Sequence, residues 1–443
     1  MKKIIKYIGM VVLVGLLTTA CEKDFTNINA PADNQVFLSK DGLIAVSIGM
    51  GQHFSTSTLA PVVEIPGLTT REFGVTSTFV TPMELAMGGE ALGGENAGVI
   101  RLWSRLLRDK GMAEEIIANV DDVELESGTK SGIKAYAKFF KAMTLGYLVQ
   151  NFEQAPINNS IDGATFNSRQ EVLAECISLL NSAISDIATD PISDEFETKV
   201  LANIDLENTL YAYLARYNLF AENYQAAIDA ADNVDLTSIS EWWYDASENK
   251  NPVYVFAVEG APDTYPQDNF GLQGSLIPEV GDGRIAFYLS PLDSTASLEL
   301  GGQDIEYAAG FFSNADSKIP VYLPGEMLLI KAEAYVGLGD LPNAVVNIDA
   351  VRTKTDDVFG VNAGLAAWTG NATDEDAVLD EIFRNRSIEL FMSGLRLEDS
   401  RRIHSDFTPS AAADVTSERN RNFYPYSYEE QNNNTNCPAD PEI

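Results

Sequence analysis

The stretch EMLLIKAEAYVGLGDLPNAVVNIDAVR, residues 326–352, decides the fold because it joins two helical segments through a short turn. Gly339 and Asp340 mark the turn. Residues 207–234, ENTLYAYLARYNLFAENYQAAIDAADNV, repeat the arrangement with a turn near Glu222. Alanines in both stretches supply small side chains where two helices can approach closely. The sequence therefore predicts two helical hairpins.

Longer helices are predicted upstream of these hairpins. Apolar residues recur every three or four positions over 102–120 and 133–152. Ser168 and Glu171 have capping-box spacing at the start of a further helix, which we expect to end before Asp190. The two hairpins resemble tetratricopeptide units, although a generic helical hairpin would give much the same pattern. The predicted fold class is mainly α: a tetratricopeptide-like scaffold of helical hairpins with a loop-rich insertion and a few short strands.

Two regions interrupt the helical pattern. Residues 51–98 and 235–320 lose the helical period and contain many glycines, prolines and aromatic residues. Alternation over 253–259 predicts a short strand in the second region. Binding residues are commonly found on irregular segments held by a rigid scaffold, so we expect the binding surface here. We expect residues 36–443 to form one domain around this scaffold.

The amino terminus predicts where the mature chain works. Residues 1–20 contain a basic start, an apolar run of secretory-signal length and a small-residue end, and Cys21 follows directly. This order resembles the lipobox of bacterial lipoproteins, in which the cysteine is acylated, although Thr18 stands where leucine is usual. Several acyl chains would anchor the protein stably, and the polar segment 21–35 would be a flexible leash. The alternative is an ordinary secreted protein cut near Ala20.

Composition excludes several classes of function. The formal net charge of −35 repels nucleic acid, and no cluster of lysines and arginines offers phosphate contacts. His53 and His404 are the only histidines, and they lie far apart without a metal-ligand or catalytic pattern. No P-loop or nucleophile elbow is present, so we predict neither an enzyme nor a cofactor or metal site. Cys176 is predicted to be buried, and its pairing with Cys437 is left open.

Aromatic residues are the remaining candidates for ligand contact. Trp242 and Trp243 stand together in SEWWYDASENKNPVYVF, and aromatic faces can stack on sugar rings. The competing interpretation is that they pack the junction between a helix and a strand. Further candidates lie in the irregular regions: Phe73, Phe79, Tyr265 and Phe270.

The carboxyl-terminal stretch AVLDEIFRNRSIELFMSGLRLEDSRR, residues 377–402, resembles the signature of the SusD/RagB family of surface nutrient-binding lipoproteins. The hairpin 326–352 and the stretch 133–157 also match that family. Ser393 and Asn385 depart slightly from the family pattern. From the residue types alone, we interpret the signature as structural, its charged side chains pairing within one turn or clamping the helix onto its neighbours. The matching positions are Arg384, Arg386, Glu389, Leu390, Gly394, Arg396, Glu398, Asp399, Arg401 and Arg402.

The resemblance implies an outer-membrane lipoprotein that faces the cell exterior. It further implies four tetratricopeptide-like helix pairs, a loop region that binds a glycan or, in some members, peptides, and a SusC-like TonB-dependent transporter as partner. No sugar-contacting motif carries over residue by residue. Our first hypothesis is a non-enzymatic lipoprotein that captures oligosaccharide or polysaccharide and passes it to the transporter for import. The alternatives are the same architecture with a peptide or another small nutrient as ligand, and a surface glycoside hydrolase, because two carboxylates in a cleft need no fixed spacing.

Overall fold

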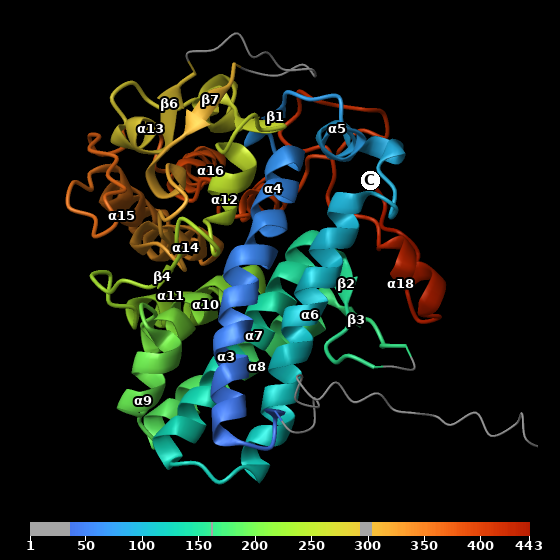
Figure 1. The fold of residues 1–443 in the computed structure, drawn as a ribbon. Coiled ribbons are helices and arrows are strands. Elements are labelled where there is room, and N and C mark those ends of the chain that lie inside the picture. The colour runs from blue at the N-terminus through green and yellow to red at the C-terminus, as the bar shows by residue number, and fades with distance from the viewer. Residues whose placement is uncertain (1–35, 161–162, 293–303) are drawn as a thin grey trace, which may run out of the picture.

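The computed structural model describes residues 36–160, 163–292 and 304–443. The expected signal peptide 1–20, the leash 21–35 and Cys21 lie outside the described residues. The chain forms a helical body; the strands β1 (Phe73–Val75), β6 (Leu289–Pro291) and β7 (Glu306–Ala308) lie at one end of it, and other short strands lie along its sides, as Figure 1 shows.

Three long helices form the first part of the scaffold: α6 (Ala97–Asn119), α7 (Ser127–Asn151) and α8 (Arg169–Thr189). Helix α7 packs between α6 and α8 and is buried along most of its length. The predicted capping box is present, because the Ser168 side chain accepts from the Glu171 backbone N–H while the Glu171 carboxylate accepts from Ser168. The predicted end before Asp190 is also confirmed.

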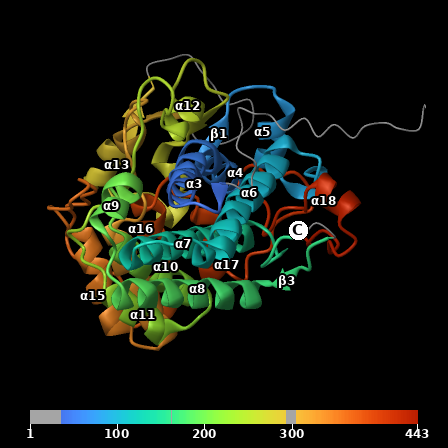
Figure 2. The ribbon, with the colours of Figure 1, turned by 60° about the horizontal axis from the view of Figure 1, so that its bottom comes forward.

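Both predicted hairpins are present. The first pairs α10 (Leu206–Phe220) with α11 (Tyr224–Asp232), and the second pairs α14 (Pro324–Gly337) with α15 (Leu341–Arg352). Their turns contain Glu222 at φ 61° and Gly339 at φ 74°. Helix α10 packs on α8 (Figure 2), and α11 packs on α14 (Figure 1), so that the pairs follow one another in space. The predicted fold class is therefore confirmed.

Two further helices complete the scaffold. Helix α16 (Glu375–Glu389) packs on both helices of the second hairpin, and α17 (Arg396–Ile403) follows it. A satellite apolar cluster fills the space between α14, α15 and α16, whereas one large cluster spans the rest of the molecule. The shorter helices outside the insertion are α9 (Asp194–Phe196) and α18 (Tyr428–Asn433).

The region 51–98 is more helical than the sequence predicted. Helix α3 (Lys40–His53) continues through a π-helical turn, Phe54–Thr58, into α4 (Leu59–Thr69), so the irregular part begins only at Thr70. Pro66 lies inside α4 and removes one backbone donor, which costs stability in an isolated helix. Burial compensates, since the apolar side chains of α4 are almost inaccessible to solvent. Strand β1 (Phe73–Val75) and helix α5 (Val80–Met87) follow.

The insertion 235–320 is irregular, as predicted, but the expected strand over 253–259 is wrong. Residues Pro252–Ala257 form helix α12, because the Asn251 side chain caps the backbone N–H groups of Val253 and Tyr254 and Pro252 occupies the first turn. The insertion also holds α13 (Gly283–Tyr288) and a set of two-stranded antiparallel pairs. These are β1 with β5 (Thr264–Pro266), β4 (Glu241–Trp242) with β8 (Ile319–Pro320), and β6 (Leu289–Pro291) with β7 (Glu306–Ala308). A further pair, β2 (Gln154–Ala155) with β3 (Asn167–Ser168), lies beside the long helices.

Helix α8 is the one described helix long and apolar enough to cross a membrane. Its apolar stripe instead packs on α7 and α10 within the scaffold. Cys176 lies on this stripe, fully buried as predicted, and its thiol donates to the Ala142 carbonyl at 3.3 Å. Cys176 and Cys437 are both free thiols, which answers the question of their pairing.

Candidate functional site

A cleft of about 280 Å³ lies where four segments distant in sequence meet. One wall is the end of α3 with the π-helical turn after it, the second is the segment 200–204, and the third is β4 with the residues that follow it; Tyr136 of α7 completes the lining. We call it the tryptophan cleft. It is lined by Ile48, Gly51, Gln52, Ser55, Thr56, Tyr136, Val200, Leu201, Ala202, Asn203, Ile204, Glu241, Trp242, Trp243 and Asn249.

The two tryptophans have different environments. Trp242 is only 5% exposed and packs against the rings of Phe54 and Phe140, with ring centroids 5.4 and 6.1 Å away. Trp243 is 57% exposed. The chain is extended here, so successive side chains alternate in direction, and Tyr244 is buried again with its hydroxyl donating to the Ser55 carbonyl. Trp242 therefore belongs to the core, and Trp243 projects its indole at the cleft.

Polar groups, all but Glu241 uncharged, share the lining of the tryptophan cleft with the indole of Trp243. The Gln52 amide donates to Asn249 Oδ1 at 2.5 Å across the cleft. The Glu241 carboxylate accepts from Lys318 Nζ at 2.8 Å, and the Glu241 backbone N–H donates to the Asn203 carbonyl. Amides and hydroxyls on the remaining walls can both donate and accept hydrogen bonds. The arrangement is an aromatic face ringed by adaptable hydrogen-bonding groups.

The loop after Trp243 is held in place by one carboxylate. Asp245 accepts hydrogen bonds from the hydroxyl of Ser247, from the backbone N–H groups of Ser247 and Glu248, and from the Asn249 amide. These donors, led by the Ser247 hydroxyl, hold the pKa of the Asp245 carboxyl well below its usual range. The ordered loop fixes Asn249 opposite Gln52 and so shapes one wall of the cleft.

The backbone around the tryptophan cleft is irregular on two sides. The π-helical turn Phe54–Thr58 carries Ser55 and Thr56 into the lining, and a second π-helical turn, Glu197–Leu201, carries Val200 and Leu201. Single π-helical turns are frequently found at functional sites. Ala202 follows the second turn at φ 50° and ψ −82°, a conformation that costs free energy for a residue with a Cβ. Sequence reasoning missed both turns, since no local composition signals them.

The other predicted contact residues do not join the tryptophan cleft. Phe73 and Phe270 are 1% and 0% exposed and pack in the core, so a ligand could reach them only if the core opened. Tyr265 is largely buried and lies against the ring of Tyr307. Phe79 is 63% exposed at the start of α5 and has no place in the cleft lining. Of the six predicted contact residues, only Trp242 and Trp243 therefore line the tryptophan cleft; the other four lie elsewhere in the fold.

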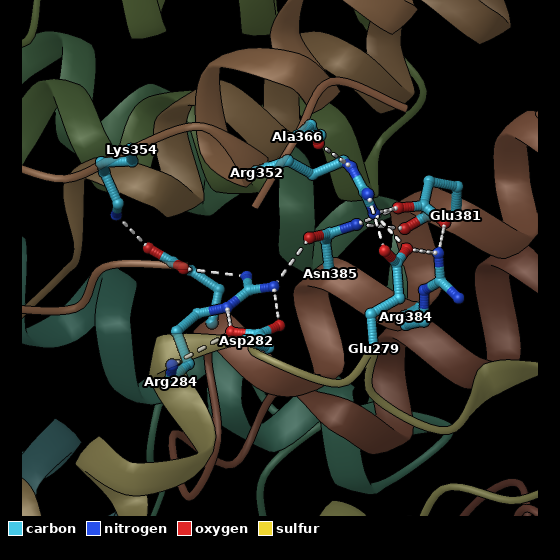
Figure 3. A network of polar contacts seen from close by, with 10 residues as sticks. Glu279, Asp282, Arg284, Arg352, Lys354, Ala366, Glu381, Arg384 and Asn385 are labelled. Carbon is cyan, nitrogen blue, oxygen red and sulfur yellow. Dashed lines mark hydrogen bonds and ion pairs between the residues drawn. The ribbon is translucent and has the colours of Figure 1, made fainter. Parts of the chain in front are cut away.

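The carboxyl-terminal signature lies in a buried polar network that we call the signature clamp (Figure 3). Arg284, 1% exposed, donates to both oxygens of Asp282, to the Glu389 carboxylate at 3.1 Å and to the Asn385 amide oxygen at 3.0 Å. Lys354 contacts the other oxygen of Glu389. The clamp therefore joins α16 to the insertion through α13 and to the segment after α15. Its members are Glu279, Asp282, Arg284, Arg352, Lys354, Glu381, Arg384, Asn385 and Glu389.

The remaining signature residues pair with neighbouring elements. Asp399 accepts from Arg386 at 2.8 Å and from Arg402 at 3.0 Å. Arg396 donates to the Phe270 and Ser387 carbonyls. Burial alone would raise the pKa of Asp399, but the two arginines outweigh burial and lower it. These contacts support the structural interpretation of the signature, in the form of a clamp between elements.

The two histidines and the acidic side chains of the described residues are the groups from which a metal or catalytic site could form. No cluster of three or more histidine, cysteine or acidic side chains suited to a metal ion occurs among the described residues. His53 Nδ1 contacts Asp109, and Asp109 also accepts from the Thr58 hydroxyl, so this histidine is engaged within the scaffold. His404 lies between Glu418 and Asp380 at the end of α17.

The chain resembles known proteins in part of its sequence and in its fold. Residues 312–440 match the model of the SusD family. No curated protein matches the chain. Similar solved structures include a SusD-like protein from Bacteroides fragilis, with a TM-score of 0.69 at 12% identity, which covers 92% of this chain and 98% of its own.

Two other similar structures are described by what they bind. A SusD-like carbohydrate binding protein from Bacteroides vulgatus has a TM-score of 0.68 at 16% identity and covers 90% of this chain and 97% of its own. A laminarin-binding SusD-like protein has a TM-score of 0.66 at 15% identity; the similarity covers 93% of this chain and 99% of that protein. At identities this low, the structural similarity establishes the fold alone. The segment 312–440, which contains α16 of the signature clamp, matches the SusD family, and the chain therefore has the fold of SusD-like proteins.

Proposed function

We propose that this chain is a surface-exposed outer-membrane lipoprotein that binds oligosaccharide or polysaccharide in the tryptophan cleft. It then delivers the glycan to a SusC-like TonB-dependent transporter for import. The single observation that carries the proposal is the exposed indole of Trp243 beside the amides of Gln52 and Asn249.

The chemistry of the tryptophan cleft suits a sugar. A pyranose ring has apolar C–H faces that stack on an indole, and its equatorial hydroxyls both donate and accept hydrogen bonds. Trp243 offers the stacking face, and the amide and hydroxyl side chains around it offer both kinds of partner. The volume of about 280 Å³ is near the lower end of ligand pockets, roughly 300–1,000 Å³. A small part of a longer glycan therefore fits the cleft.

Binding without hydrolysis is the second part of the proposal. Glycoside hydrolysis generally needs two carboxyl groups facing the scissile bond. Glu241 is the one carboxylate among the described residues of the lining, and Lys318 already pairs with it. The similar structures described as carbohydrate binding and laminarin binding support a binding role.

The anchor and the partner rest on the amino-terminal pattern and on the match to the SusD family. We propose acylation of Cys21, a leash over 21–35 and a single domain over 36–443 that faces the exterior beside the transporter. Cys21→Ser is expected to abolish labelling by radioactive palmitate and to release the protein from the outer membrane. Palmitate label that persists on the variant would contradict the anchor.

Calorimetry tests the ligand. The mature protein is titrated with laminarin, mannan, galactan, xylan and starch oligosaccharides, and separately with a peptide panel. We expect binding to at least one glycan, and loss of that binding in Trp243→Ala but not in Phe79→Ala, whose exposed ring lies outside the cleft. Peptide binding without glycan binding would replace glycan by peptide as the ligand. Tagged protein isolated from the native membrane should retain a barrel-sized transporter, and its absence would remove the delivery step.

A further inference from the structure

We infer that the tryptophan cleft selects uncharged glycans and excludes uronic-acid and sulfated ones, an inference that rests on the proposed function. Glu241 is the single charged side chain among the described residues of the cleft wall, and its charge is negative. Every other polar contribution comes from amides and hydroxyls, which recognise sugar hydroxyls without balancing an anion.

The cations near the tryptophan cleft are already paired. Lys318, which is not a lining residue, has its Nζ 2.8 Å from the carboxylate of Glu241 in the cleft wall. Lys40 at the start of α3 and Lys199 in the second π-helical turn both pair with Glu195, at 2.5 and 2.9 Å. Carboxylate and sulfate groups are recognised by arginine or lysine donors that are free to face them. An anionic sugar in this cleft would meet no arginine or lysine among the lining residues. It would have to compete with Glu241 for Lys318.

A second hollow, of about 670 Å³, adjoins the tryptophan cleft and would face the next units of a longer glycan. It shares Leu201, Ala202 and Ile204 with the tryptophan cleft and therefore lies across the same segment. Its charged lining is acidic throughout the described residues: Glu197, Asp205 and Glu207.

The second hollow also lacks a free helix N-terminus. Helix α10 begins beside it, and helix N-termini attract anions. Here Asp205 caps α10, and its Oδ1 accepts from the Asn208 backbone N–H at 3.1 Å. The helix end is thus occupied by the chain's own carboxylate. A polyanion leaving the cleft over Ala202 would encounter like charge, which costs affinity.

The discriminating experiment compares matched neutral and anionic glycans. Mannan oligosaccharides and mannuronate oligosaccharides share a β-1,4-mannose backbone and differ at C6, where one carries a hydroxymethyl group and the other a carboxylate. Laminarin and chemically sulfated laminarin, which share one β-1,3-glucan backbone, form a second pair and extend the panel to sulfate. We expect the anionic member of each pair to bind at least about tenfold more weakly than its neutral counterpart. Raising the salt from about 20 to about 500 mM should strengthen any residual anion binding and leave neutral binding nearly unchanged.

Two variants are expected to change the difference in affinity between neutral and anionic glycans. Glu241→Gln removes the negative charge and releases Lys318, so the difference between neutral and anionic glycans should narrow. Lys318→Gln is the matched variant, which removes the cation and should widen the difference. An anionic glycan that binds as tightly as its neutral counterpart, and does so through Trp243, would overturn the inference while leaving glycan binding intact. Failure of every neutral and anionic glycan to bind would overturn the proposed function and the inference with it.

Discussion

The signature clamp and the tryptophan cleft are both rich in polar side chains, but they use them in opposite ways. In the clamp, Arg284 and Glu389 are almost inaccessible to solvent, and each meets partners from other elements of the chain. In the cleft, Trp243 and Gln52 face solvent, and one short amide contact is the main link across the walls. A polar group satisfied inside the fold stabilises the structure, whereas one with spare hydrogen-bonding capacity at an opening can bind a ligand.

Removal of one clamp residue is expected to have the largest effect. Arg284→Ala would leave the carboxylates of Asp282 and Glu389 buried without their guanidinium, so the free energy of unfolding should fall by about 3–5 kcal/mol. Urea unfolding followed by circular dichroism measures the change. Arg108→Ala is the control, since Arg108 is exposed and should change the stability by less than about 0.5 kcal/mol. Equal stability of the two variants would show that the clamp does not hold the insertion to the scaffold.

The floor of the tryptophan cleft is expected to behave like the core. Trp242→Ala removes a ring packed on Phe54 and Phe140 and should lower the free energy of unfolding by about 3–5 kcal/mol. Trp242→Phe keeps an aromatic ring and should recover part of the loss, measured by the same unfolding curves. A stable Trp242→Ala protein that fails to bind glycan would instead place this indole among the ligand contacts.

Gly394 of the signature tests backbone fit. It adopts φ +77°, and a Cβ there would lie 2.3 Å from the carbonyl oxygen of Val62, the acceptor left without an intrahelical donor by Pro66. Gly394→Ala should therefore cost about 2–3 kcal/mol, strain and clash together. Gly339→Ala is the matched control, with φ +74° and open space around it, and should cost about 1 kcal/mol. Thermal unfolding of both variants measures the difference, and equal costs would mean that the contact with α4 contributes nothing.

His404 adds a smaller, pH-dependent effect on the scaffold side. Burial lowers its pKa, but the hydrogen bonds and charges of Glu418 and Asp380 outweigh burial and raise the pKa above its usual value. A raised histidine pKa stabilises the fold fully below the unfolded pKa, about 6.5, and this contribution is lost as the pH rises through the folded pKa.

The His404→Gln variant measures this contribution. The stability difference between the native protein and the variant should be largest near pH 5.5 and shrink toward pH 8.5. Unfolding midpoints across this range provide the test. A difference that grows with pH would reverse the assigned sign.

Local signals explain why the helical hairpins could be predicted. The capping box at Ser168 and the turn at Gly339 are encoded within a few residues, and both are present in the structure. The helix through Pro66 could not be predicted in the same way, because burial among distant segments stabilises it against its own proline. The strand expected over 253–259 failed for a local reason: Asn251 and Pro252 form a helix start that outweighs the alternating pattern.

The site was predictable only in part. The pair Trp242–Trp243 stood out by composition, but their opposite directions follow from the pairing of β4 with β8, and that pairing joins residues far apart in the chain. The other lining residues, such as Gln52 and Asn203, carry no local signal, since four segments distant in sequence bring them together. The partners of Glu389 in the clamp are likewise about a hundred residues upstream at Arg284 or after α15 at Lys354. Long-range packing therefore determines both regions.

Trp243→Ala is expected to have the smallest effect on stability and the largest effect on glycan binding. Trp243→Ala removes an indole that is 57% exposed, so the free energy of unfolding should change by no more than about 0.5 kcal/mol. Loss of the stacking face should weaken glycan binding at least tenfold, which corresponds to about 1.4 kcal/mol. Calorimetry and unfolding curves on one preparation measure both quantities. If Trp243→Ala unfolds as readily as Trp242→Ala, the indole supports the fold, and the contrast between the signature clamp and the tryptophan cleft fails at the residue where it should be sharpest.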